Sequence, residues 1–217
     1  MDSIRNKIKQ SKSLVGPFPA FDLDVVPEYP HDLFLEWFDV ALHHDVHEPH
    51  AMTLSTIDYS GSPDARILIL KDVDEDGWYF ASSCESKKGK QLEANNHVAL
   101  TFYWSLIGRQ VRIRGKVEKM DIETNKKDFL HRGVVARAVS FIGKQSSVLH
   151  EQNDFNHALA KQLHYVQENS TSVYPAWTVY RVVAGEVEFW QADEERKHRR
   201  LLYRLVEGQW HREKLWP

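Results

Sequence analysis

The order of apolar and polar residues predicts a chain made mainly of strands after residue 50. Short runs rich in β-branched and aromatic residues, bounded by turn residues, are typical of strands. They cover residues 51–57, 65–70, 78–82, 98–104, 110–119, 177–190, 201–206 and 210–215. The turns at residues 58–63 and 74–77 contain Gly61 and Gly77, and strand–turn–strand units of this kind indicate an antiparallel meander.

Helical patterns precede and interrupt these strands. The predicted helices cover residues 4–12, 33–44, 86–94, 121–131 and 152–168, and Asp32 and Ser86 are the expected N-caps of the second and third. Residues 16–30 contain four prolines, which favour an extended arm over a helix. We therefore expect residues 1–30 to form a basic segment and a Pro-rich arm, and residues 31–217 to form a single domain. At least six strands with helices between them favour a closed, mainly antiparallel β-barrel with peripheral α-helices, an α+β fold.

Length and composition fit one globular domain of ordinary character. The chain has 217 residues, of which 42% are hydrophobic and 27% charged, and its net charge is -3. This charge gives no sign of a nucleic-acid partner, and no apolar run approaches the ~20 residues of a membrane span. The single cysteine, Cys84, allows no intramolecular disulfide and fits a reducing compartment, so we expect a cytoplasmic protein.

Histidines gather near the end of the predicted helix 33–44. His43 and His47 are four residues apart, a spacing that places two metal ligands on one helical face. The alternative is a solvated helix end, because Glu48, Pro49 and His50 fall where the helix should stop and no nearby acidic and histidine set completes a site. We therefore predict no metal site.

The segment Ser86-Lys87-Lys88-Gly89-Lys90 combines a helix cap with several cations. Free backbone N–H groups and lysines at a helix N-terminus form a good anion site. Lysines there oppose the helix dipole unless an anion binds, so their position points to an anionic ligand. The alternative is a solvated basic helix face.

Three further segments carry candidate binding groups. The strand Arg66–Lys71 has charged ends and an apolar middle, and its alternation places Arg66 and Lys71 on opposite faces. Gln110, which can donate and accept hydrogen bonds, begins an alternating strand and suits the edge of a flavin-type ring. Arg196, His198 and Arg200 fall on one face if their segment is extended, which is the pattern of a substrate site or of an exposed basic rim.

Read together, these segments resemble the pyridoxine 5′-phosphate oxidase family in order and spacing over about residues 33–217. The landmarks are Glu48–Met52, RILILK (66–71), SKKGKQLEAN (86–95), LTFYW (100–104), GRQVRIRGKVE (108–118), KQSS (144–147), EFWQ (188–191), RKHRRLLYR (196–204) and the ending Leu215-Trp216-Pro217. The resemblance implies a homodimeric split β-barrel with two FMN sites at the dimer interface. It also implies an FMN-dependent oxidase of vitamin B6 metabolism, which oxidises the C4′ amine or alcohol of its substrate to the aldehyde, with O2 as acceptor.

The resemblance also implies a role for each matching residue. The residues implied to bind FMN are Arg66, Ile67, Leu68, Ile69, Leu70, Lys71, Ala81, Ser82, Lys87, Lys88, Gln110, Gln145, Ser146, Trp190 and Arg200. Those implied to face the substrate are Lys71, Arg132, Arg196 and His198. Arg196 and His198 are implied to be catalytic, because they would orient the C4′ substituent and assist proton removal.

The chain departs from the family at the expected substrate-phosphate cluster. The family's Tyr, Arg and Ser correspond here to Asp128, Arg132 and Ala136. An aspartate facing a phosphate dianion repels it, and alanine lacks the hydroxyl donor. Two alternatives therefore stay open: an oxidase of the phenazine-biosynthesis type with a phosphate-free aromatic substrate, and a flavin-binding protein without vitamin B6 turnover.

Overall fold

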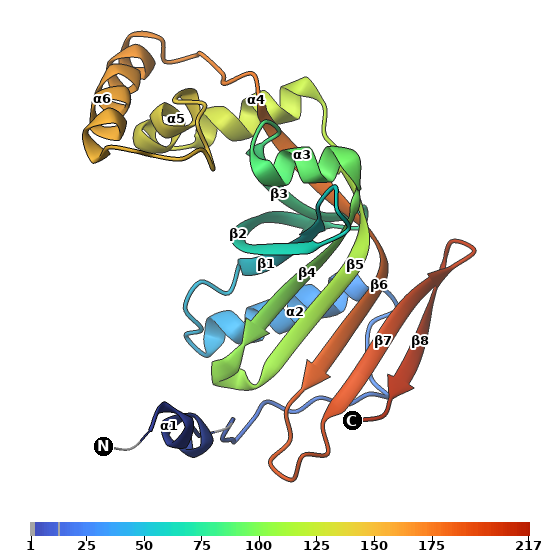
Figure 1. Ribbon diagram of the computed structural model, residues 1–217. Coiled ribbons are helices and arrows are strands. Elements are labelled where there is room, and N and C mark those ends of the chain that lie inside the picture. The colour runs from blue at the N-terminus through green and yellow to red at the C-terminus, as the bar shows by residue number, and fades with distance from the viewer. Residues whose placement is uncertain (1–2, 13) are drawn as a thin grey trace. The chain divides into compact units, whose positions relative to one another are not determined.

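The structure is a computed structural model that describes residues 3–12 and 14–217 (Figure 1). Helices and strands alternate along the chain much as the sequence predicts. The helices are α1 (Ile4–Gln10), α2 (Pro30–His43), α3 (Lys87–Ala94), α4 (Ile122–His131), α5 (Val134–Phe141) and α6 (Gln152–Glu168), with a short 3-10 turn, η1 (Ser105–Ile107). The strands are β1 (Ala51–Ile57), β2 (Pro63–Asp74), β3 (Gly77–Ser83), β4 (His97–Trp104), β5 (Arg109–Lys119), β6 (Trp177–Gln191), β7 (Arg199–Val206) and β8 (Gln209–Leu215).

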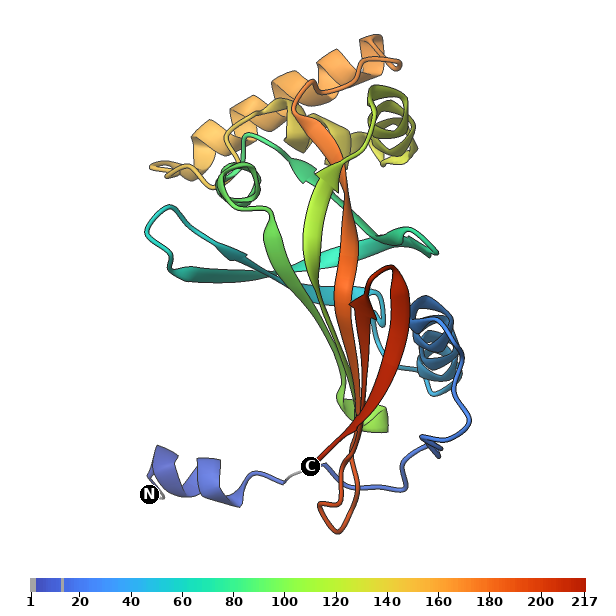
Figure 2. The ribbon, with the colours of Figure 1, turned by 90° about the vertical axis from the view of Figure 1, so that its right-hand side faces the viewer.

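The eight strands found in the described residues form one sheet in the order β3-β2-β1-β4-β5-β6-β7-β8. β3 also pairs with β6, antiparallel, with Phe80 opposite Tyr180. This second pairing closes the first six strands into a barrel, so the predicted closed antiparallel barrel with peripheral helices is confirmed. β7 and β8 continue the sheet as an antiparallel hairpin with the turn at Glu207 and Gly208 (Figure 2).

The contacts within the chain divide it into two units, which we describe separately. Unit 1 comprises the residues up to Met52, Leu100–Ile113 and Gly185–Pro217. Unit 2 comprises Thr53–Ala99 and Arg114–Ala184. The predicted domain bounds of 1–30 and 31–217 stay a prediction. No helix in the described ranges is long and apolar enough to span a membrane.

The core of unit 1 is a chain of aromatic contacts between α2 and the strands. Phe34 meets Phe102 with 4.9 Å between ring centroids, and Trp37 meets Phe189 edge-to-face at 5.1 Å. Phe34 and Trp37 are both buried and lie on the apolar face of α2. The helix begins at Pro30 rather than after Asp32, because proline is well suited to the first turn, where no backbone donor is needed. The predicted Asp32 cap is therefore wrong, and Tyr29 takes the N-cap position.

The arm that precedes α2 has no helix or strand between residue 14 and Tyr29, as its prolines predict. Its Phe21 ring is buried against Trp37, with 4.8 Å between the ring centroids. Arg109 Nη2 donates to the carbonyl of Ala20 (3.3 Å), and Arg199 donates to the carbonyl of Phe21. The arm is therefore tied to unit 1 by buried apolar area and by cationic donors.

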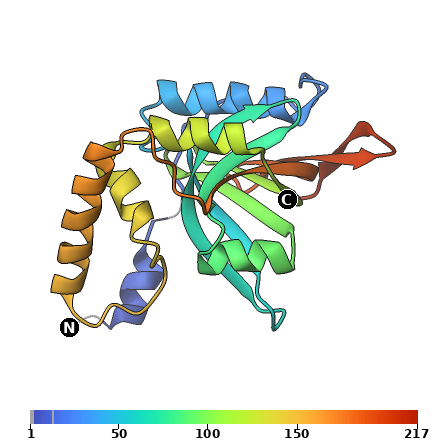
Figure 3. The same cartoon turned by 90° about the horizontal axis from the view of Figure 1, so that it is seen from above.

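Besides α3, unit 2 contains α4, α5 and α6, which follow one another along the chain, and α5 lies beside α6 (Figures 1 and 3). The sequence pattern did not predict α5. Arg132 ends α4 in an extended conformation, and Gly133 begins α5 directly afterwards without a side-chain cap. The core here is also aromatic: Phe129 contacts Phe141 (5.6 Å) and Trp177 (5.9 Å).

Candidate functional site

A cluster of cationic side chains forms where β2 and the N-terminus of α3 lie in unit 2. We call Arg66, Lys87 and Lys88 the cation cluster. Ser86 caps α3, because its Oγ accepts a hydrogen bond from the N–H of Gly89 (3.2 Å). The cap holds the first turn of α3 and with it the backbone donors and the two lysines, which is the geometry of an anion site.

Arg66 is positioned by buried acceptors on neighbouring elements. Its Nη1 donates to Thr56 Oγ1 (2.6 Å) and to the carbonyl of Leu54 (3.3 Å), and its Nη2 donates to Gln91 Oε1 (3.0 Å). Thr56 and Gln91 are also joined directly, at 2.7 Å, and both are buried. The guanidinium is therefore held in one orientation. Sequence patterns do not reveal these two supporting residues, because a lone threonine or glutamine forms no motif.

Lys88 is a buried cation with a single neutral partner. Its side chain donates to Ser82 Oγ (3.2 Å), and among the described residues no carboxylate forms an ion pair with it. Burial, and after it the nearby Arg66 charge, lowers the pKa of the Lys88 ammonium. A buried ammonium is costly without a counter-ion, so this site is matched to an anion that enters from outside.

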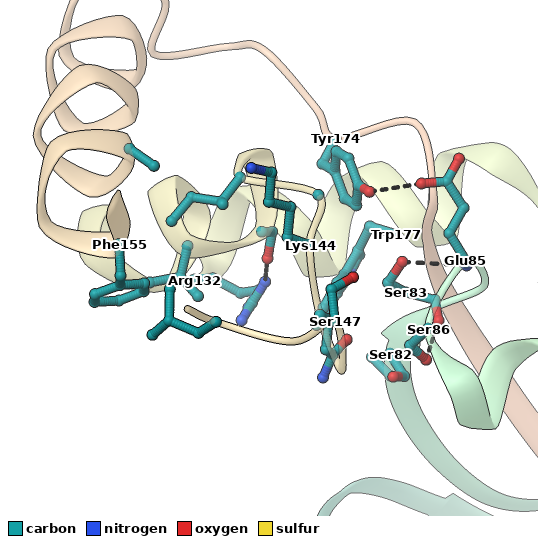
Figure 4. A pocket seen from close by; sticks show the side chains of 18 of the residues that line it. Ser82, Ser83, Glu85, Ser86, Arg132, Lys144, Ser147, Phe155, Tyr174 and Trp177 are labelled. Atoms are coloured by element: carbon teal, nitrogen blue, oxygen red, sulfur yellow. Dashed lines mark hydrogen bonds between the residues drawn. The ribbon is translucent and has the colours of Figure 1, made fainter. Parts of the chain in front are cut away.

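Beside the cluster lies a cavity of about 720 Å³ within unit 2. Predicted site residues that line it are Ile67, Leu68, Ile69, Lys71, Ala81, Ser82, Arg132 and Gln145. Figure 4 shows one side of the cavity, where the Tyr174 hydroxyl donates to Glu85 (2.9 Å) close to Ser82, Ser83 and Ser86. A cavity of this size, with apolar strand residues and a few polar groups, suits a small organic ligand.

Two cations of this cavity lie next to the hydrogen-bonded pair of Trp177 and Asp128. Lys71 Nζ lies 2.9 Å from Asp128 Oδ1, and Trp177 Nε1 donates to Asp128 Oδ2 at 2.8 Å. Arg132 lies over the Trp177 ring, 3.8 Å from its centroid, and donates to Ser140 Oγ (2.6 Å). Burial lowers the pKa of the Arg132 guanidinium, and the nearby Asp128 charge partly opposes this.

Two predicted site residues of unit 2 lie on other parts of β2 and the following loops. Leu70 is half-buried on the face of β2 that also carries Arg66, because the burial of β2 alternates as the sequence predicts. Ser146 is exposed in the loop after α5, with a positive φ of 70°. Neither residue lines the cavity.

The remaining predicted residues belong to unit 1. Trp190 and His198 contact each other, with 4.7 Å between ring centroids. Arg200 pairs with the buried Glu188, with Nη2 2.7 Å and Nε 2.9 Å from the same carboxylate oxygen. Gln110 is half-buried on β5.

The expectation that Arg196, His198 and Arg200 share one face of an extended segment is wrong. Residues 193–196 form a turn closed by a hydrogen bond from the Arg196 N–H to the Asp193 carbonyl (3.1 Å), Arg196 has a positive φ of 64°, and β7 begins only at Arg199. The backbone N–H of Asp193 donates to His198 Nδ1 (3.2 Å) and so closes the turn. Because Nδ1 accepts this bond, a neutral His198 carries its proton on Nε2 and presents that nitrogen as a donor.

Two parts of the chain match models of known protein families. Residues 39–153 match the family model described as pyridoxamine 5′-phosphate oxidase, and residues 177–217 match the pyridoxine 5′-phosphate oxidase C-terminal dimerisation region. The chain belongs to the pyridoxamine 5′-phosphate oxidase family.

Relatives in this family are similar over nearly the whole chain. The pyridoxine/pyridoxamine 5′-phosphate oxidase of Pseudomonas paraeruginosa is 38% identical over 193 residues, which cover 88% of this chain and 90% of that protein. The enzyme of the same name from Synechocystis is 35% identical over 192 residues, with the same coverage. The predicted membership of the family is therefore confirmed.

Solved structures support the same fold. PhzG from Burkholderia lata, in complex with tetrahydrophenazine-1-carboxylic acid, is 27% identical and superposes with a TM-score of 0.86 over 93% of this chain and 100% of that chain. An FMN-binding protein of Nostoc punctiforme related to pyridoxamine 5′-phosphate oxidase is 16% identical, with a TM-score of 0.71 over 88% of this chain and 100% of that chain. The split-barrel prediction is thus confirmed by structures with distant sequences.

Two aspartates of unit 2 form ion pairs with cations of the predicted site. Asp128, predicted from the resemblance to replace a tyrosine, pairs with Lys71, and Asp64 pairs with Arg66. Arg137 lies beside Ala136, the expected serine position, and its Nη2 is engaged by backbone carbonyls. It is buried and donates to the carbonyls of Ser170 (2.5 Å) and Ser172 (3.3 Å). The sequence pattern does not reveal Asp64, because a carboxylate at the start of a strand is usually an ordinary solvated residue.

Proposed function

We propose that this protein is an FMN-dependent oxidase that converts pyridoxine or pyridoxamine 5′-phosphate into the C4′ aldehyde. The observation that carries the proposal is the buried Lys88 at the capped start of α3, which has no carboxylate partner among the described residues and lies in the cation cluster beside the cavity. The names of the curated relatives, at 35–38% identity, support the same activity.

The residues present fit FMN. The cation cluster, together with Ser82 and the backbone donors of α3, would hold the cofactor's phosphate. The strand residues Ile67–Ile69 and Ala81, which line the cavity, would lie along the ring system. Bound FMN would supply the redox chemistry, namely a two-electron acceptor for the hydride of the C4′ carbon that O2 can reoxidise.

The chain's own residues would bind and orient the substrate. Lys71 and Arg132 line the cavity and supply the cations that an anionic substrate needs. His198, with its Nδ1 occupied by the Asp193 amide, is arranged to donate from Nε2 to an oxygen or to a neutral amine at C4′. Arg196 precedes His198 by two residues and would also help to orient the C4′ substituent.

The oxidase would work as a homodimer with FMN at the interface. The region that matches the dimerisation model, residues 177–217, includes Trp190, Arg196, His198 and Arg200. Two protomers would then complete each FMN shell with Gln110, Trp190 and Arg200. The single Cys84 fits the reducing cytoplasm as the place of this activity.

A second candidate function rests on the Lys71–Asp128 ion pair. Because Asp128 neutralises Lys71, the cavity offers less net positive charge to a phosphate dianion. This favours an aromatic substrate without phosphate, such as the ligand in the PhzG structure named above.

The test measures flavin content and oxygen uptake on the same preparation. We expect a yellow protein that releases FMN, not FAD, on denaturation, and that consumes O2 with pyridoxine and pyridoxamine 5′-phosphates. Turnover of pyridoxine or another phosphate-free aromatic compound alone would favour the second candidate. A colourless protein that does not take up added FMN would refute both.

A further inference from the structure

One carboxylate, Asp64, forms ion pairs with two members of the cation cluster, Arg66 and Lys87. Asp64 Oδ2 lies 2.9 Å from Arg66 Nη2, 3.0 Å from Lys87 Nζ and 3.0 Å from Gln91 Nε2. Three donors thus meet on a single carboxylate oxygen. The Gln91 bond first, and then the Lys87 bond, lower the pKa of Asp64, so the carboxylate stays charged throughout the neutral range.

The partners of Arg66 differ in burial, and this difference shows which of them an incoming anion can replace. Thr56 and Gln91 are buried, and they hold Arg66 from the interior. The Asp64 side chain keeps 28% of its surface exposed, so it is the partner that solvent and ligands can reach. An anion that binds Arg66 from outside must therefore share or displace Asp64.

We propose that Asp64 is an internal competitor of the cofactor's phosphate: it occupies Arg66 and Lys87 until the phosphate takes these two cations over. The proposal rests on FMN as the cofactor, as inferred above. The carboxylate keeps two cations in place when no phosphate is bound and lowers the affinity of the site for the phosphate. Three cations and one carboxylate leave two net positive charges, which match a phosphate dianion.

Lys88 is the fixed part of this arrangement. It is buried, contacts Ser82 and forms no ion pair with Asp64, so it remains available to the phosphate in either state. Asp64 is therefore a residue that sets cofactor affinity rather than one that binds FMN. Its removal should act on the phosphate and leave the affinity for the flavin ring unchanged.

The experiment titrates FMN and riboflavin into full-length protein from which bound flavin has been removed, with quenching of flavin fluorescence as readout. For Asp64→Asn we expect a Kd for FMN about tenfold lower than in the wild type, because one repulsive charge is lost at a partly exposed site. Riboflavin lacks the phosphate, so its Kd should stay within about twofold. The matched control is Asp72→Asn, the same change at an exposed position of the same strand, which should alter neither Kd.

The outcomes separate this inference from the proposed function. Unchanged or weaker FMN binding by Asp64→Asn, with normal binding by the wild type, refutes the role of Asp64 alone. Equal tightening for FMN and riboflavin refutes it as well, since the effect would not act through the phosphate. If the wild type binds no FMN, the proposed cofactor fails together with the inference. Asp64→Ser, judged by the same criteria, decides the question if the asparagine variant does not fold.

Discussion

The Lys71 ammonium and the Asp128 carboxylate form an ion pair with 2.9 Å between Nζ and Oδ1. Trp177 Nε1 fixes the second carboxylate oxygen, so Asp128 is held by two partners. Lys71 lines the cavity, and its charge is partly neutralised before any substrate arrives. The affinity for a phosphate ester therefore depends on the ion pair. If Lys71 leaves Asp128, both Lys71 and Arg132 can bind the phosphate; if it does not, only Arg132 can.

Replacement of Asp128 by asparagine tests this dependence. Asparagine keeps an acceptor for the Trp177 N–H and removes the charge that neutralises Lys71. We expect the KM for pyridoxine 5′-phosphate to fall about fivefold, while turnover of unphosphorylated pyridoxine hardly changes. Steady-state oxygen uptake measures both. The control is Asp154→Asn, another carboxylate that lines the cavity. An equal or higher KM for the phosphate ester would show that Asp128 does not limit phosphate binding.

The cation cluster is tested by the double variant Arg66→Ala, Lys88→Ala. Loss of both cations removes the charge and the donors proposed for the cofactor's phosphate, so we expect the purified protein to retain no FMN. Absorbance of the flavin relative to the protein gives the result. Lys90→Ala is the matched control, because Lys90 is an exposed lysine of the same helix and should leave flavin content unchanged. Full flavin content in the double variant would exclude both residues from the site.

His198 is tested by its effect on turnover at constant flavin content. His198→Ala removes the Nε2 donor, and we expect kcat/KM to fall about a hundredfold, in the range of other general acid–base groups. Flavin content should be unchanged. His198→Gln keeps an N–H donor and should recover part of the loss. His164→Ala, at an exposed position of α6, serves as the control. Unaltered kinetics of His198→Ala would remove this residue from the proposed reaction.

Sequence alone predicted the strands and the capped start of α3 well, because both are local patterns. Alternating residues of β2 and the capped start of α3 are local patterns, and both appear in the structure as expected. The helix α5 was missed because Arg132 and Gly133 interrupt the pattern that would otherwise join it to α4. The turn at Arg196 was missed because its left-handed φ depends on the bond between the Asp193 amide and His198.

The electrostatics of the site could not be predicted from local pattern. Asp64 and Lys87 are far apart in the chain, as are Lys71 and Asp128, and each pair meets only through the fold of unit 2. A carboxylate on an exposed strand or helix gives no local signal of its partner. These long-range ion pairs change the charge of the site from the one that the sequence motifs alone imply.

The close approach of α3 to the backbone before it gives a prediction about stability and flavin binding together. A Cβ at Gly89 would lie 2.3 Å from the carbonyl oxygen of Cys84 and 2.5 Å from that of Ser83, and these backbone atoms cannot move aside. Alanine gains about 1 kcal/mol of intrinsic helix propensity over glycine. The clash should outweigh this gain and displace the first turn of α3, with a net loss of about 2 kcal/mol in the free energy of unfolding.

Gly133 provides the contrast that separates the clash from the loss of a glycine. A Cβ there meets nothing within 4 Å, and the φ of -59° suits any residue. We therefore expect Gly133→Ala to change the free energy of unfolding by only about 0.5 kcal/mol, whereas Gly89→Ala melts earlier and binds FMN more weakly. Chemical denaturation and flavin titration of both variants measure the two effects. Equal stability and equal FMN affinity in the two variants would show that the contact of α3 with Ser83 and Cys84 is not what positions the cation cluster.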